Sequence, residues 1–191
     1  MERAFLEKEF STKPIDPRPN PVRDFLSSPG DVDLIHFAGH GCAEMAALAD
    51  AKLLLQGRID NVDGQQKYVE EYIHARTVEQ FANLTGEDGS QPIVVLNACQ
   101  VGRAGYRLSG IGGFAQAFLR RGAGVFVGTL WSVGDKPART FVEAFYLRLK
   151  NGERISRAAI AARKTAMKAG DATWLAYTVY GNPHASLLSK S

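Results

Sequence analysis

Two residues capable of chemistry, His40 and Cys99, each stand just after an apolar run of the chain. The first lies in the segment HFAGHGC, residues 36–42, and the second in VVLNACQVG, residues 94–102. A cysteine is a useful nucleophile as its thiolate, and a nearby imidazole favours or produces that state. If the two apolar runs are neighbouring strands, these residues form the two halves of a cysteine nucleophile site.

Glycines beside the histidine strengthen this interpretation. Gly39 and Gly41 allow the backbone to turn sharply and approach a ligand closely. The amides of Gly41 and Cys99 can then form an oxyanion hole, in which one donor contributes about 10²–10³ in rate. A free cysteine is often only a small buried hydrophobe, and Gly-His-Gly is often only a tight turn. The prediction therefore depends on both features occurring together, histidine first.

His36 is the competing histidine. It lies four residues before His40, and in an extended strand this separation is about 13 Å. The two imidazoles cannot then share one substrate atom or one metal ion. We therefore predict that His36 is a hydrogen-bonded core residue and that the site needs no metal or other cofactor.

Buried strands and helices alternate along most of the chain. Short apolar runs predict strands within residues 31–40, 92–99, 122–133 and 174–181. Helical spacing and helix-ending glycines predict helices within residues 112–122, 135–152 and 156–170. This alternation indicates an α/β fold with a mostly parallel sheet between helices. Ligands bind such sheets beyond the carboxyl ends of the strands, where His40 and Cys99 fall.

The remaining segments are less regular. Residues 52–75 predict a small inserted β-hairpin with an Asp-Gly turn. A Thr77–Gln80 capping box then predicts the start of a helix that closes at Gly86. Residues 13–25 contain four prolines and predict a loop or extended arm, which leads into a short helix before Pro29.

Composition narrows the class of protein. The 191 residues, 45% hydrophobic and 23% charged, suit one soluble globular domain. The net charge of +3 is dispersed, which argues against direct nucleic-acid binding. No apolar run is long enough to span a membrane. Two cysteines and no secretory leader predict a reducing, cytoplasmic location.

Four blocks of the sequence together resemble a known family. They are DLIHFAGHG, VVLNACQVG, GGFAQAFLRRGAGVFVGTLWSVGD and TWLAYTVYGNP. They are similar to the CHAT domain, a caspase-like cysteine peptidase family of clan CD that is related to separases and caspases. The resemblance implies a caspase-like three-layer sandwich, a dyad of His40 and Cys99, and an oxyanion hole that includes Gly41. The caspase pattern Q-A-C-x-G is only approximated by NACQVG.

The block LWSVGD resembles a separase-like pattern whose acidic residue lies in the primary specificity pocket. The resemblance implies that Asp135 fills this role, with Trp131 and Ser132 as further substrate-binding residues. A carboxylate there would prefer Arg or Lys before the cleaved bond. Asp135 can equally be the cap of the following helix. Both interpretations stay open at this point.

The resemblance implies a bacterial cysteine endopeptidase that acts on a protein or peptide substrate under the control of a partner or additional domain. Tetratricopeptide repeats are one such domain. Residues 31–191 would be the peptidase domain. Residues 1–30 would be an arm or a remnant of upstream structure, with residues 4–10 as a remnant strand. Two alternatives remain: an inactive interaction module, and a Cys-His amidohydrolase acting on a small molecule. The order of histidine and cysteine differs from that of papain-like enzymes.

Overall fold

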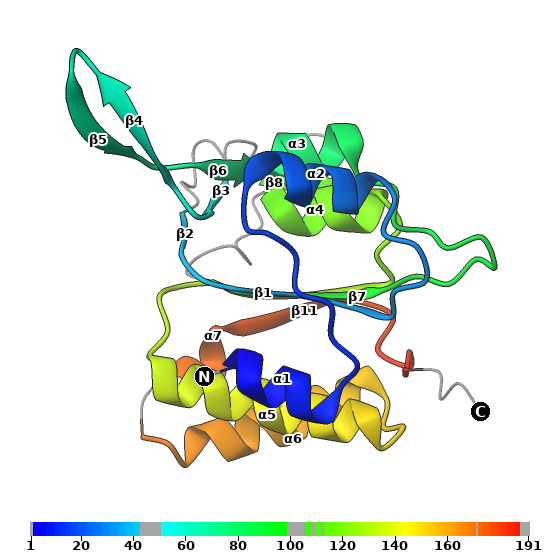
Figure 1. Ribbon diagram of the computed structural model, residues 1–191. Coiled ribbons are helices and arrows are strands. Elements are labelled where there is room, and N and C mark those ends of the chain that lie inside the picture. Colours follow the sequence, from blue (N-terminus) through cyan, green and yellow to red (C-terminus); the bar gives the residue numbers. More distant parts are fainter. Residues whose placement is uncertain are drawn as a thin grey trace.

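A central four-stranded sheet organises the described part of the chain (Figure 1). The structure is a computed structural model and describes residues 2–42, 51–98, 106–107, 110–111, 113–170 and 172–187. The sheet order is β1 (Leu34–Ala38), β7 (Ile93–Asn97), β10 (Val125–Thr129) and β11 (Tyr177–Gly181). The first three strands are parallel, and β11 is antiparallel to β10. The predicted mostly parallel sheet is confirmed.

Helices cover both faces of this sheet, as Figure 1 shows. The upper layer in that view consists of α2 (Pro19–Ser27), α3 (Ala75–Phe81) and α4 (Gly113–Arg120). The lower layer consists of α1 (Glu2–Glu9), α5 (Asp135–Lys150), α6 (Ile155–Met167) and α7 (Thr173–Ala176). These two helix layers on either side of the sheet confirm the predicted three-layer arrangement. Within the described ranges, no helix has the length and apolarity that crossing a lipid bilayer requires.

The apolar runs form strands because both faces of the sheet are covered. Every residue of β7 and of β10 is buried. Side chains alternate along β7, so Val94 and Leu96 pack into the upper core whereas Ile93 and Val95 pack into the lower one. A strand with two buried faces needs apolar residues at nearly every position, which is the pattern read from the sequence.

The long helices match the predicted spacing. Phe141, Phe145 and Leu149 of α5 lie on one buried face, each at most 1% exposed. The helix ends at Lys150, and Gly152 follows with a φ of 76°. Glycine adopts this left-handed conformation at little cost, which explains why the helix stops there.

The inserted hairpin is confirmed but is divided into two parts. Near the body, β3 (Lys52–Leu54) pairs with β6 (Tyr72–His74) and with the two-residue strand β2 (Gly41–Cys42). Further out, β4 (Arg58–Val62) pairs with β5 (Gln65–Val69) and projects from the body (Figure 1).

Two details of backbone geometry explain the hairpin's shape. Its turn is formed by Asp63 and Gly64, with φ values of 54° and 77°, as an Asp-Gly turn of this type requires. Between the two parts, a β-carbon on Gly57 would lie 2.5 Å from the Tyr68 ring and from the Val69 carbonyl oxygen, so the close approach there requires glycine. A further short pair joins the backbones of β8 (Tyr106–Arg107) and β9 (Gly110–Ile111).

Three predictions from the sequence were wrong. Residues 4–10 do not form a remnant strand; they lie largely in α1, where Leu6 packs against the lower core. The capping box at Thr77 is absent, because α3 already begins at Ala75, directly after β6, and ends at Phe81. The last strand is shorter than predicted, because residues 173–176 form one helical turn before β11.

Candidate active site

The carboxyl ends of β1 and β7 lie side by side. Ala38 is paired with Asn97 at the end of the parallel ladder, and the Gly39 amide donates to the Asn97 carbonyl at 3.3 Å. His40 follows two residues beyond Ala38 and is exposed. Its carbonyl accepts a hydrogen bond of 2.9 Å from the Leu54 amide, which ties this turn to the inserted sheet. The predicted general base is thus at the rim of the sheet and open to solvent.

The predicted nucleophile, Cys99, lies outside the described residues. The residue before it is described: Ala98 is 2% exposed, and its carbonyl accepts a hydrogen bond from the hydroxyl of Thr129 at the end of β10. The backbone leading to Cys99 is therefore anchored to the neighbouring strand. For the second cysteine, Cys42, only the backbone in β2 is described.

The predicted substrate-binding residues Trp131 and Ser132 lie in the connection from β10 to α5, and Asp135 is the first residue of α5. All three are exposed. Since β10 is parallel to β7, its carboxyl end faces the same rim as that of β1. Two backbone amides of this connection donate hydrogen bonds to α7. The Leu130 amide donates to the Ala176 carbonyl at 2.9 Å, and the Gly134 amide donates to the Thr173 hydroxyl at 3.3 Å.

The capping alternative for Asp135 is wrong. Gly134 is the N-cap of α5, no side chain caps this helix end, and Asp135 stands in the first turn. A carboxylate in the first turn still interacts favourably with the helix dipole. Because it makes no capping bond, its charge remains available to a ligand.

A partly buried group of polar side chains lies next to the rim, on the lower face of the sheet. His36 Nδ1 lies 2.7 Å from the Tyr146 hydroxyl, and its Nε2 lies 3.0 Å from a Glu2 carboxylate oxygen. The other oxygen of Glu2 accepts from the Asn97 side-chain amide, and the Tyr177 hydroxyl donates to the Asn97 oxygen at 2.6 Å. The predicted hydrogen-bonded role of His36 is confirmed.

Both branches of this network end on the Glu2 carboxylate. A carboxylate only accepts, so His36 Nε2 must carry a hydrogen, and Nδ1 can then accept from Tyr146. His36 was predicted from the sequence as a hydrogen-bonded residue, whereas its partners Glu2 and Asn97 were not predicted. The available signal was polarity alone: Asn97 is a polar residue at the end of an otherwise apolar strand.

Burial changes the ionisation of both tyrosines. It raises the pKa of Tyr146 well above the usual 10, and the nearby charge of Glu2 raises it further. The pKa of Tyr177 is raised well above 10 for the same two reasons. Both hydroxyls therefore remain neutral donors at any ordinary pH. In the described ranges, no three His, Cys, Asp or Glu side chains are grouped so that they could hold a metal ion.

A family model of the CHAT domain matches residues 11–182. The chain belongs to the CHAT domain family. The comparison with curated protein sequences found no match.

Solved structures with a similar fold include a cysteine proteinase and a separase chain. The Arg-specific cysteine proteinase gingipain R matches with a TM-score of 0.64 and 15% identity, over 97% of this chain and 41% of its own. A chain of the Saccharomyces cerevisiae separase–securin complex matches with a TM-score of 0.57 and 16% identity, over 95% of this chain and 10% of its own. These likenesses show that the CHAT domain has a caspase-like fold. The domain spans less than half the length of either chain.

Proposed function

We propose that this CHAT domain is a cysteine endopeptidase that cleaves a protein substrate, with Cys99 as nucleophile and His40 as general acid and base. The observation that carries the proposal is the register of the two strands. Ala38 is paired with Asn97, and His40 and Cys99 each follow their strand-end residue by two positions. A histidine and a cysteine at equivalent places beyond adjacent parallel strands favour a shared site.

The proposed reaction is acyl transfer. The Cys99 thiolate attacks the scissile carbonyl carbon, and the oxyanion accepts hydrogen bonds from the Gly41 and Cys99 amides. The imidazolium of His40 gives its proton to the leaving amine, which departs and leaves a thioester. His40 then takes a proton from water as the water attacks the thioester, and the carboxylate product and the thiol are released. Every group in this sequence is supplied by the chain and by water.

Asp135 is proposed to select a basic residue before the cleaved bond. Its exposed carboxylate stands beyond β10, beside the strand that leads to Cys99, and makes no capping bond. Arg would form a charge-assisted pair with it, and a bidentate one where geometry allows. One of the similar structures is itself described as Arg specific. Trp131 and Ser132 are proposed to line the same pocket.

The chain is proposed to work under the control of a further domain or partner. The support is its coverage of only 41% and 10% of the gingipain and separase–securin chains that it resembles. The second of these was solved with a protein partner, securin.

The test is cleavage of fluorogenic peptides that end in Arg, Lys, Ala or Asp at the cleaved bond. We expect Cys99→Ala and His40→Ala to lower kcat/KM for the Arg peptide by at least about 10³-fold. Cys42→Ala and His184→Ala are the matched controls and should stay within about twofold of the wild type. Asp135→Asn should reduce the preference for Arg over Ala without abolishing turnover.

A peptidyl electrophile with Arg at its reactive end tests the nucleophile apart from turnover. Mass spectrometry should find the adduct on Cys99 and not on Cys42, with slower labelling in His40→Ala. Equal cleavage by wild type and Cys99→Ala would exclude the mechanism. An absence of both cleavage and labelling would favour an inactive interaction module.

A further inference from the structure

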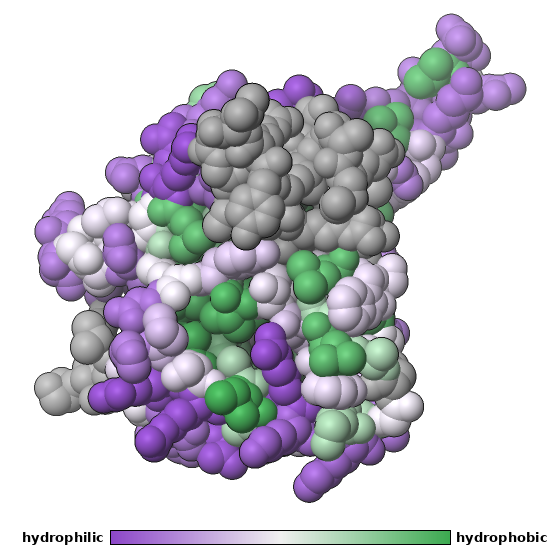
Figure 2. Space-filling view, turned by 180° about the vertical axis from the view of Figure 1, so that it is seen from behind, coloured by the Kyte–Doolittle hydropathy of each residue, from purple (hydrophilic) through white to green (hydrophobic). Residues whose placement is uncertain are grey.

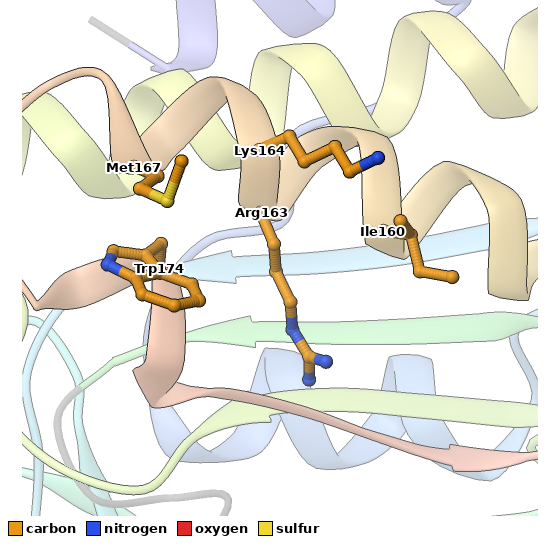
Figure 3. A pocket seen from close by; sticks show the side chains of 5 residues that line it. All are labelled: Ile160, Arg163, Lys164, Met167 and Trp174. Carbon is orange, nitrogen blue, oxygen red and sulfur yellow. The ribbon is translucent and has the colours of Figure 1, made fainter.

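A small pocket lies on the lower layer, between α6 and α7 (Figure 3). Its volume is about 200 Å³, and Ile160, Arg163, Lys164, Met167 and Trp174 line it. Pockets for drug-sized ligands measure about 300–1,000 Å³. This one therefore suits a single large side chain rather than a whole small molecule.

The outer face of α6 carries exposed apolar side chains. Its inner face is already buried in the lower core through five residues: Ile155, Ala158, Ala159, Ala162 and Ala166. Ile160 and Met167 lie seven residues apart on the opposite side and are 54% and 50% exposed. Leu175 of α7 is 50% exposed as well. In Figure 2, hydrophobic side chains are scattered among hydrophilic ones over the lower half of the molecule.

The charge around the pocket has one sign. From Arg154 to Gly170 the sequence contains five basic residues and no acidic one. Lys164 is exposed and makes no ion pair with any described residue. Arg163 donates through Nη2 to the Tyr177 carbonyl at 2.6 Å, whereas its buried Nε has no partner among the described residues. No carboxylate of the described chain neutralises either cation.

We propose that this pocket docks a short acidic segment of another protein, with one large apolar side chain inserted beside Trp174 and a flanking carboxylate on Lys164. Apolar walls beside an exposed cation that no described carboxylate pairs with are complementary to an apolar residue next to Asp or Glu. The apolar groups line a hollow rather than project as a continuous ridge, which favours an inserted side chain over a flat lipid surface. The docking needs neither Cys99 nor His40, so it stands apart from the proposed peptidase activity.

The experiment pans a display library of random seven-residue peptides against the folded protein. We expect enriched peptides to combine Asp or Glu with Leu, Ile, Phe or Trp. Fluorescence anisotropy of the best labelled peptide should show binding at least tenfold weaker to Lys164→Glu and to Ile160→Ser. Lys67→Glu makes the same charge change on the projecting hairpin and should bind like the wild type.

Trp174 provides a local readout. The chain has two tryptophans, so in a Trp131→Phe background all tryptophan fluorescence comes from Trp174 in the pocket. Its emission should change as the peptide is added and should not change in Lys164→Glu. Three results would overturn the proposal: no enrichment, enriched peptides without carboxylates, or equal binding to Lys164→Glu. A different outcome would assign the surface to a membrane: the protein binds no peptide but sediments with phosphatidylserine vesicles, and Lys164→Glu abolishes this sedimentation.

Discussion

The two faces of the central sheet differ in the kind of side-chain contact that their strands make. On the upper face, Leu96 and Phe126 pack in an apolar core with residues of α3 and α4. The lower face has an apolar core of its own, but there β1 and β7 also carry His36 and Asn97, which are hydrogen-bonded to Glu2 and to two tyrosines. The same sheet thus packs against an apolar core on one face and contributes to a polar network on the other. His36, a member of this network, lies four residues before His40 in the sequence.

Apolar packing and a polar network differ in the substitutions that they accept without a large loss of stability. An apolar core accepts a substitution that keeps volume, at a cost of less than about 1.5 kcal/mol. A polar network is stable only when each member keeps its partners, because an unpaired buried polar group costs about 1–3 kcal/mol. Substitutions of matched size on the two faces therefore test the comparison directly.

The largest effect is expected on the apolar face. Phe126 is 0% exposed and stacks against Phe118. Phe126→Ala should lower the free energy of unfolding by about 3–5 kcal/mol, from lost burial and the cavity left behind. Urea unfolding followed by circular dichroism measures this, with Phe126→Leu as the volume-conserving control. A loss as small as that of the control would mean that this face is not tightly packed.

Removal of the central carboxylate should have the next largest effect. Glu2→Ala leaves the His36 imidazole and the Asn97 amide without their acceptor. We expect the free energy of unfolding to fall by about 2–3 kcal/mol. Glu2→Gln keeps one acceptor oxygen and should cost less. Equal stability of Glu2→Ala and the wild type would show that the Glu2 carboxylate does not stabilise this network.

Alkaline pH should destabilise the polar face selectively. The pKa of Tyr146 and of Tyr177 is raised well above 10 in the folded protein, so both stay protonated when the unfolded chain begins to ionise near pH 10. Their contribution is complete below pH 10 and is lost as pH rises toward the folded pKa. The slope is about 1.4 kcal/mol per pH unit for each tyrosine.

Urea unfolding at several pH values from 9 to 11 measures this slope. A variant with Tyr146→Phe and Tyr177→Phe is the control, because it removes both ionising groups and should flatten the curve. Identical slopes in this variant and the wild type would exclude the two tyrosines as its source.

The smallest effect is expected from one hydroxyl. Tyr146→Phe removes the partner of His36 Nδ1 and leaves the ring packing intact. The free energy of unfolding should fall by about 1 kcal/mol. NMR chemical shifts of the His36 ring nitrogens at one pH in both proteins provide a second measurement. An unchanged ring signal would contradict the hydrogen bond.

The sheet and its long helices could be predicted from the sequence because burial on two faces leaves a local signature. β7 and β10 are apolar at almost every position, and Gly152 marks the end of α5. The first helix was missed because its seven-residue pattern fits either structure. The signal that distinguishes them is the Arg3–Glu7 pair, four residues apart and in contact at 2.7 Å.

Only part of the candidate site could be predicted in the same way. The edge of the sheet at which His40 and residues 131–135 lie could be predicted, because strand ends are marked by local sequence features. The Glu2–Asn97 contact joins residues 95 positions apart, and no spacing rule reaches that far. The dyad itself remains a prediction, since Cys99 lies outside the described residues.

The partly buried carboxylate at position 2 has a practical consequence for recombinant production. Trimming of this residue by a contaminating protease would remove the acceptor on which the imidazole and the amide both depend. Preparations should also be checked by intact mass before their melting curves or turnover numbers are compared.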